Sequence, residues 1–235
     1  FLLIYLVNND GSPSLKIPWI ILMLVLPILG GIAYVCFGRT PVRKKEKDCM
    51  IELVKRSQSA LSQLPDASDL LKQEAPLYAG QSHYIEWANQ RKPYTHTDCE
   101  YLPLGEVMFK RLCEELNKAQ EYIFMEYFIV EEGTMWNTLL KILEEKVKAG
   151  VEVRMMYDDL GCIMTLPDHY DQKLEAMGIK TVVFNRFTAH LTVSHNNRDH
   201  RKITVIDGNV GFNGGINLAD EYINAYAKHG HWKDS

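Results

Sequence analysis

The segment that decides the fold reads HRKITVIDGNVGFNGGIN over residues 200–217. Its β-branched and apolar residues predict one strand over residues 200–206 and a second over residues 209–212. The Asp207-Gly208 pair between them is a strong signal for a tight hairpin turn. The segment is therefore expected to contribute two neighbouring strands to a sheet.

Two side chains with useful chemistry stand at the start of this hairpin. Side chains at positions i and i+2 of a strand point the same way, so His200 and Lys202 are expected to share one face. An imidazole can attack phosphorus to form a covalent intermediate, and a neighbouring ammonium can hold the non-bridging oxygens as negative charge builds. Asp207, in the turn, could orient an imidazole and stabilise its charged form. Taken singly, each residue has an ordinary alternative: a half-buried histidine, a surface lysine and a turn aspartate.

The residues after the hairpin favour a phosphate site. Gly214 and Gly215 carry no side chain, so the backbone can approach a ligand closely there. The amide of Asn217 can donate a hydrogen bond to a phosphate oxygen.

The chain before the hairpin alternates between helical and strand patterns. Apolar residues recur at helical spacing over residues 108–119, 136–147 and 168–177. Runs typical of buried strands cover residues 122–130, 151–157 and 180–184. This alternation predicts an α/β domain whose sheet is mostly parallel and covered on both faces.

The first 38 residues have the composition of a membrane hairpin. Residues 17–37 carry no charge, and as one helix they would be roughly 31 Å long, close to the ~30 Å hydrocarbon core of a bilayer. The apolar run over residues 1–7 is too short to span a membrane and is interpreted as the remnant of a first span. A buried helix of a soluble domain is the alternative.

Charge is distributed unevenly around a formal net value of −4. Five basic residues follow the apolar segment closely: Arg39, Arg43, Lys44, Lys45 and Lys47. The positive-inside rule places everything after Phe37 in the cytoplasm. The acidic to neutral remainder argues against a nucleic-acid-binding surface. The five cysteines contain no Cys-x-x-Cys pair, which argues against a disulfide framework or a zinc site.

The middle of the chain gives weaker signals. Apolar spacing predicts a helical region over residues 46–75, interrupted at Pro65. Residues 76–105 show no clear period and are interpreted as loop and irregular structure.

The motif resembles one family closely. Residues 200–217 match the signature His-x-Lys-x4-Asp-x6-Gly-(Gly/Ser)-x-Asn of the phospholipase D superfamily at every defined position. Three further segments, with the apolar hairpin in front, are similar to bacterial cardiolipin synthases: residues 126–129, 157–161 and 217–222. The resemblance covers nearly the whole chain.

The resemblance implies a fold and a domain order. The fold would be α/β, with a phospholipase D-like mixed, mostly parallel sheet flanked by helices and preceded by a transmembrane helical hairpin. The hairpin would occupy residues 1–38, a basic juxtamembrane helix and linker residues 39–105, and an incomplete first catalytic half residues 106–235. The protein would be a multi-pass protein of the bacterial cell membrane with a cytoplasmic catalytic domain.

The resemblance also implies roles for the site residues. His200 would be the nucleophile, Lys202 and Asn217 would bind the phosphate beside Gly215, and Asp207 would support the histidine. Glu126 resembles an acidic residue near the family's site, with an ordinary salt bridge as the alternative.

Other polar residues receive structural interpretations. Asp158 and Asp159 suggest a metal pair, but the family needs no metal or other cofactor, so a loop-ordering role is preferred. The remaining histidines near the motif are interpreted as loop or surface residues: His190, His195, His229 and His231.

The implied reaction joins two lipids. Attack on one phosphatidylglycerol would release glycerol, and the hydroxyl of a second would resolve the phosphohistidine to cardiolipin. Water (phospholipase D) or serine (phosphatidylserine synthase) as acceptor would use the same chemistry, and an inert membrane-bound lipid-binding or assembly module is an alternative of another class. Family members carry two such motifs and this chain one, so a missing second catalytic half or a homodimer partner is expected to complete the site.

Overall fold

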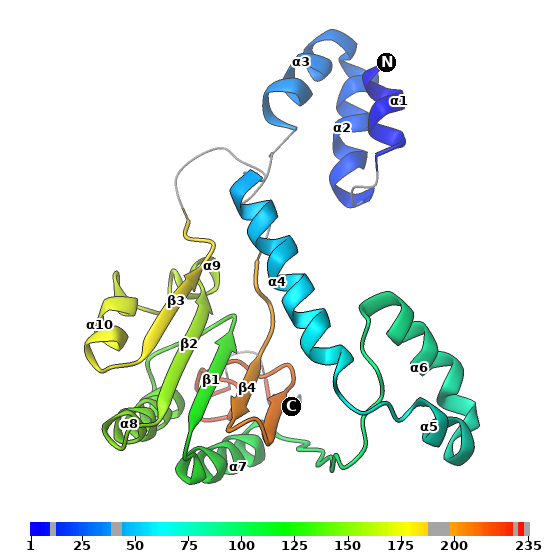
Figure 1. Ribbon diagram of the computed structural model, residues 1–235. Coiled ribbons are helices and arrows are strands. Elements are labelled where there is room, and N and C mark those ends of the chain that lie inside the picture. Colours follow the sequence, from blue (N-terminus) through cyan, green and yellow to red (C-terminus); the bar gives the residue numbers. More distant parts are fainter. Residues whose placement is uncertain (10–12, 39–43, 188–197, 228–229, 233–235) are drawn as a thin grey trace. The chain divides into compact units, whose positions relative to one another are not determined.

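The computed structural model describes residues 1–9, 13–38, 44–187, 198–227 and 230–232 (Figure 1). The chain divides into two compact units, Phe1–Glu100 and Tyr101–Ser235. Each unit has its own buried apolar cluster.

Three helices open the first unit: α1 (Leu2–Val7), α2 (Pro13–Val25) and α3 (Pro27–Phe37). The single helix predicted over residues 17–37 is wrong, because the helical path breaks at Leu26, where φ is −130° and ψ is 77°. The ring of Pro27 disfavours a helical conformation of the residue before it and removes a backbone donor. Within the described residues, no helix combines the length and the apolar character needed to cross a bilayer.

Helices α2 and α3 pack against each other. Trp19 and Tyr34 meet edge to face with ring centroids 5.6 Å apart. Gly30 lies so close to α2 that a Cβ atom there would stand 2.7 Å from the carbonyl oxygen of Leu22. The absence of a side chain at Gly30 therefore permits the close approach of the two helices.

The rest of the first unit is also helical, with α4 (Lys44–Ser62), α5 (Ser68–Glu74) and α6 (Pro76–Asn89). Helices α4 and α5 confirm the predicted helical region and its interruption around Pro65. The loop predicted over residues 76–105 is wrong in its first half, which forms α6.

Helix α6 escaped prediction because its large apolar residues do not face a core. Leu77 is 82% exposed and Trp87 is 74% exposed. Burial therefore imposes no apolar stripe on this helix, and a stripe is what the periodicity argument detects.

The second unit is built around a five-stranded sheet. Its elements are, in chain order, α7 (Gly105–Lys118), β1 (Tyr122–Tyr127), α8 (Thr134–Lys148), β2 (Glu152–Asp158), α9 (Asp159–Cys162), α10 (Tyr170–Ala176), β3 (Lys180–Phe184), β4 (Ile203–Ile206) and β5 (Val210–Asn213). The strand order is β3-β2-β1-β4-β5. Strand β1 pairs with β2 and β2 with β3 in parallel, whereas β1 with β4 and β4 with β5 are antiparallel. The predicted mixed α/β sheet is confirmed, but its pairings are half parallel rather than mostly parallel.

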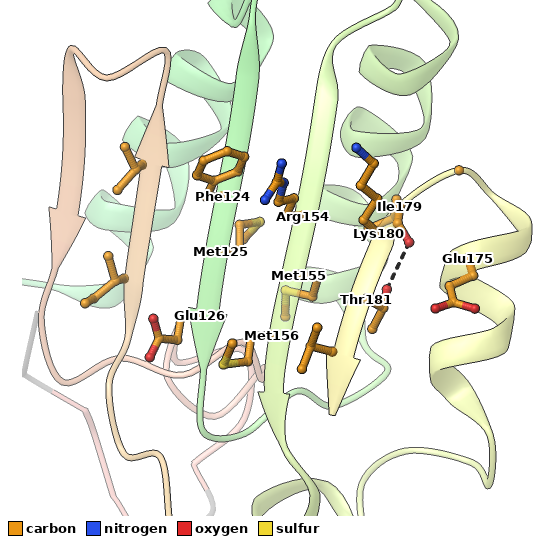
Figure 2. A pocket seen from close by; sticks show the side chains of 14 residues that line it. Phe124, Met125, Glu126, Arg154, Met155, Met156, Glu175, Ile179, Lys180 and Thr181 are labelled. Atoms are coloured by element: carbon orange, nitrogen blue, oxygen red, sulfur yellow. Dashed lines mark hydrogen bonds between the residues drawn. The ribbon is translucent and has the colours of Figure 1, made fainter. Parts of the chain in front are cut away.

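The core lies between the sheet and helices α7 and α8, which stand behind the strands in Figure 2. Alternate residues of β1 are buried on this side, Ile123 and Met125 among them. Leu112 of α7 and Trp136 and Leu139 of α8 are fully buried against them. Alternation in the strand and the apolar stripes of two helices thus produce a single core.

The opposite face of the sheet carries an open hollow of about 940 Å³ (Figure 2). Residues lining it from the sheet include Phe124, Glu126, Arg154, Met156, Val182 and Ile203. The prediction that helices cover both faces is therefore wrong for the described part of this unit, since the centre of this face is hollow.

The predicted hairpin turn is confirmed. Asp207 and Gly208 have φ values of 52° and 68°, the left-handed conformations that a tight hairpin between β4 and β5 requires.

Candidate active site

His200 and Lys202 meet around the ring of Phe128. Strand β4 begins at Ile203, so the prediction that His200 and Lys202 lie within the strand is wrong; both precede it. The exposed imidazole of His200 packs on Phe128 with ring centroids 4.7 Å apart. The Nζ atom of Lys202 lies 5.2 Å from the centre of the same ring. Phe128 follows β1 directly, so the antiparallel pairing of β1 and β4 brings the histidine and lysine together at the end of β1.

Lys202 is a buried cation. The residue is 5% exposed, and its Nζ donates a hydrogen bond to the carbonyl oxygen of His200 at 2.6 Å. Burial lowers the pKa of Lys202, and the nearby carboxylate of Asp199 partly offsets this. An ammonium carries three donors, of which the His200 carbonyl uses one. The side chain is therefore suited to hold an anionic oxygen close to the imidazole.

Asp158 anchors the backbone in front of His200. This fully buried residue ends β2, and its carboxylate accepts hydrogen bonds from the backbone N–H of Asp199 at 2.9 Å and of Gly161 at 3.0 Å. It also pairs with the guanidinium of Arg198 at 3.2 Å. The neighbouring Asp159 accepts a hydrogen bond from the backbone N–H of Phe187 at 2.6 Å. Both aspartates thus order the segments around the site.

Glu126 lies beside a second carboxyl group. Arg201 bridges the two acids, with Nε 2.9 Å from Asp199 Oδ1 and a terminal nitrogen 2.7 Å from Glu126 Oε1. Burial, reinforced by the neighbouring Asp199, raises the pKa of Glu126 to about 7, although Arg201 opposes the shift. Burial alone would raise the pKa of Asp199, but hydrogen bonds from Glu126 and Arg201 outweigh it and hold that pKa below its usual range.

The structure does not bring Asp207 to the imidazole. Its carboxylate accepts three backbone hydrogen bonds at 2.8–2.9 Å, from Gln120, Glu121 and Tyr122 at the start of β1. These bonds lower its pKa, that from Tyr122 most. The four residues of β4, roughly 13 Å of strand, separate Asp207 from the His200 end. The geometry gives Asp207 the part of a brace between the hairpin and β1.

Asn217 is buried beside the end of β1 and has protein partners. Its Oδ1 accepts a hydrogen bond from the backbone N–H of Ile129 at 2.9 Å, and its Nδ2 donates to the Tyr222 hydroxyl at 2.8 Å. Gly215 is half-buried in the segment that connects β5 to Asn217. Asn217 is therefore hydrogen-bonded to the residue that follows Phe128, and its Oδ1 atom and one Nδ2 hydrogen are already engaged.

Several residues named from the sequence fall elsewhere. His190, His195, His229, Arg39 and Arg43 lie outside the described residues. His231 has its Nε2 atom 3.9 Å from a carboxylate oxygen of Glu106. In the ranges that the structure describes, no three His, Cys, Asp or Glu side chains are grouped as metal ligands would be.

Three contributors to the site were missed in the sequence: Phe128, Asp199 and Arg201. Asp199 and Arg201 flank His200 directly, and this charged pair around a histidine was an available signal. Phe128 gave no such signal, because an aromatic residue after a buried strand is most simply explained as core.

Two known protein families match this chain, and one of the matches covers the site residues. Residues 112–227 match the family model described as "Cardiolipin synthase, PLD-like domain", and residues 1–39 match that described as "Phospholipase_D-nuclease N-terminal". The first match contains His200, Lys202, Glu126 and Asn217. This chain belongs to the phospholipase D superfamily. The resemblance inferred from the motif is confirmed.

Relatives of this phospholipase D superfamily chain match it along nearly its full length. A protein of Streptococcus mutans serotype c described as uncharacterized is 39% identical over 99% of this chain and 50% of its own. The cardiolipin synthase of Oceanobacillus iheyensis is 30% identical over 99% of this chain and 49% of its own, and that of Geobacillus kaustophilus is 31% identical over 100% and 47%. The chain thus spans about half the length of these relatives.

Proposed function

We propose that the full-length protein is a cardiolipin synthase, which transfers a phosphatidyl group from one phosphatidylglycerol to another. The observation that carries the proposal is the meeting of an exposed imidazole, His200, and a buried ammonium, Lys202, around Phe128. This pair lies in a domain that matches the cardiolipin synthase family model.

The reaction proceeds in two displacements at one phosphorus atom. An imidazole nitrogen of His200 bonds to phosphorus, the bond from phosphorus to the terminal glycerol oxygen breaks, and that oxygen takes a proton and leaves as glycerol. The hydroxyl of a second phosphatidylglycerol then loses its proton and attacks phosphorus, which frees the imidazole and yields cardiolipin. No cofactor enters either step.

Charge on the phosphoryl oxygens is balanced by groups beside His200. Lys202 supplies a fixed ammonium for the non-bridging oxygens. Asn217 supplies the second Nδ2 hydrogen, which the bond to Tyr222 does not use, and the backbone at Gly215 lets the phosphate approach. Asp207 and Glu126 help to position these groups, Asp207 by bracing the hairpin against β1 and Glu126 by its contact with Arg201.

The proton for the leaving oxygen must come from a general acid, and we assign that role to a second histidine. The second catalytic half of the full-length protein is the proposed source, with a homodimer partner as the alternative. The chain spans about half the length of its cardiolipin synthase relatives, which supports the first source.

The lipid substrates imply a membrane location. We propose a hairpin over residues 1–38, a basic juxtamembrane region over residues 39–105 and a cytoplasmic first catalytic half over residues 106–235, in a multi-pass protein of the bacterial cell membrane. The match of residues 1–39 to a separate family model supports a distinct amino-terminal segment. A reporter fused after the catalytic half should give a cytoplasmic signal, and a periplasmic signal would contradict this topology.

The acceptor is tested by supplying alternatives to the full-length protein. Vesicles of phosphatidylglycerol should yield cardiolipin and free glycerol, and His200→Ala should abolish both products. His83→Ala, an exposed histidine of α6, is the matched control and should behave as the parent. Phosphatidic acid as the main product would instead indicate a phospholipase D, and phosphatidylserine formed with added serine a phosphatidylserine synthase. A folded, membrane-bound protein that forms none of these would be an inert module.

A further inference from the structure

The strongest feature not used by the reaction is the pair of carboxyl groups beside His200. Asp199 is 4% exposed, and the guanidinium of Arg201 lies 2.9 Å from its Oδ1 atom and 2.7 Å from Oε1 of Glu126, which brings the two carboxyl groups together. Two carboxylates can share a hydrogen bond only when one of them carries a proton. Because burial raises the pKa of Glu126 to about 7 while that of Asp199 is lowered, the proton resides on Glu126.

Arg201 ties this pair to the chain on the far side of His200. Its Nε bonds to Asp199 at 2.9 Å and its terminal nitrogen lies 2.7 Å from Glu126. Its backbone N–H also donates to Asp199 Oδ1 at 3.3 Å. The two residues that flank His200 are therefore joined to each other and to β1 through their side chains.

The segment before His200 is fixed separately. Asp158 of β2 holds the Asp199 backbone N–H and the Arg198 guanidinium, and Arg198 also donates to the carbonyl oxygen of Asn185 at 3.0 Å. His200 itself is exposed and contacts Phe128. Its placement over that ring thus depends on how firmly its neighbours are held.

We propose that Glu126 and Asp199, sharing one proton and bridged by Arg201, form a positioning device that holds His200 against Phe128 and loosens when the proton is lost. Glu126 and Asp199 are positioning residues: Glu126 acts through the side chain of Arg201, and Asp199 and Arg201 flank the histidine. Loss of the proton leaves one buried and one half-buried negative charge side by side with one guanidinium to offset them, and the repulsion favours opening of the segment.

Other charged groups near Glu126 are engaged elsewhere. Arg154 of β2 and Lys180 of β3 line the same hollow, and both pair with Glu152. Glu175 also lines the hollow, from α10 beyond β3. On the Asp199 side, Asp158 is paired with Arg198, and Asp199 raises the pKa of Lys202 against the larger effect of burial. Among the carboxyl groups of this cluster, Glu126 is the one whose pKa burial raises to about 7.

The size of the effect follows from proton linkage. If Glu126 has a pKa of about 7 in the closed segment and its ordinary value of 4.5 in the open one, the opening equilibrium rises about tenfold between pH 6 and pH 8. The sign is fixed, because the closed state binds the proton more tightly and is favoured at the lower pH.

Hydrogen–deuterium exchange of the full-length protein tests this inference. We expect exchange of peptides covering residues 198–202, after correction for the intrinsic pH dependence of amide exchange, to rise about tenfold from pH 6 to pH 8 in the parent. Glu126→Gln, which replaces the protonated carboxyl by a neutral amide, should remove this rise. Glu144→Gln is the control and should keep it, since Glu144 lies in an ion pair with Lys148 on α8.

The outcomes separate this inference from the proposed function. A flat corrected profile in the parent, or the same rise in Glu126→Gln, would overturn the positioning device. In assays of phosphatidyl transfer, Glu126→Gln should keep kcat high at pH values where the parent loses it, with KM unchanged. If Glu126 had only a structural role, the substitution would leave the pH profile of kcat unchanged. A parent that shows the exchange pattern but no transfer would refute the proposed function and leave the positioning device standing.

Discussion

At the scale of single residues, the site depends on charges held where water has little access. Lys202 is nearly fully buried, yet its Nζ lies over the Phe128 ring and bonds to the His200 carbonyl. Attraction between the ammonium and the ring face helps retain the charge in this setting. Because a charge acts more strongly where water is excluded, Lys202 is well placed to stabilise a phosphoryl group that becomes more negative.

Lys202 can be tested by separating charge from shape. Lys202→Met should lower the transfer rate of the full-length protein by at least about two orders of magnitude, the scale for removal of one preorganised donor. Lys202→Arg keeps the charge and should retain part of the rate. Lys180→Met, at an exposed lysine of β3, is the control and should match the parent. A Met variant as active as the parent would refute the phosphate-binding role.

Asp207 should prove to be a stabilising residue. Asp207→Ala removes the acceptor for three backbone N–H groups at the start of β1 and should lower the melting temperature clearly, while Asp69→Ala, at an exposed ion pair of α5, should change it little. The folded state lowers the pKa of Asp207, so its contribution is present above the ordinary pKa near 3.8 and is lost as pH falls through the lower folded value. Melting curves from pH 7 down to pH 2 give the measurement. A variant with the parent's stability throughout would leave the brace unsupported.

At the scale of elements, the site is assembled from the ends of strands. Phe128 follows β1, Asp158 ends β2, and His200 and Lys202 precede β4. The segment after β5 returns to the same place, where Leu218 exchanges backbone hydrogen bonds with Ile129 and Glu131 at 3.1 and 3.0 Å. Residues just beyond strand ends are suited to form a site because their side chains and backbone groups are not used in the sheet.

The returning segment also supports helix α8, and this link is testable. Asp220 accepts hydrogen bonds from the backbone N–H groups of Thr134 and Met135, at 2.8 and 2.7 Å, at the first turn of the helix. Asp220→Ala should therefore cost about 1 kcal/mol in the free energy of unfolding, as for loss of a helix cap. Chemical denaturation measures the change, with Asp168→Ala, at an exposed aspartate, as the control. A cost no larger than that of the control would contradict the capping role.

At the scale of the whole molecule, the second unit presents an unfilled sheet face. The hollow of about 940 Å³ is lined largely by apolar side chains, and Glu126 is one of the charged residues that also line it. Apolar surface of this extent is costly to leave in water. The chain also spans about half the length of its cardiolipin synthase relatives.

We expect this 235-residue chain alone to form no detectable cardiolipin, whereas the full-length protein does so through His200. A lone imidazole can attack phosphorus, but the leaving glycerol oxygen lacks its general acid, which is worth about two to four orders of magnitude. Parallel assays on phosphatidylglycerol vesicles, with product measured by mass spectrometry, decide the matter. Turnover by the chain alone near that of the full-length protein would indicate a symmetric dimer, which sedimentation analysis would detect.

The sequence by itself determined the features that depend on neighbouring residues. The Asp207-Gly208 turn follows from local backbone preferences, and the alternating helices and strands follow from local apolar periods. The spacing from His200 to Asn217 was enough to indicate the superfamily. Where burial imposed no period, as in α6, or where Pro27 divided an uncharged run, the same reasoning failed.

Only the tertiary structure decided how the site is assembled. Asp207 contacts residues 85 to 87 positions away, and Asn217 bonds to a residue 88 positions away, because β4 pairs antiparallel with β1 rather than with a sequence neighbour. The same pairing places Phe128 where His200 and Lys202 both lie close to its ring. Strand pairing is set by the burial of the whole sheet against α7 and α8, a sum over many side chains that no local pattern contains.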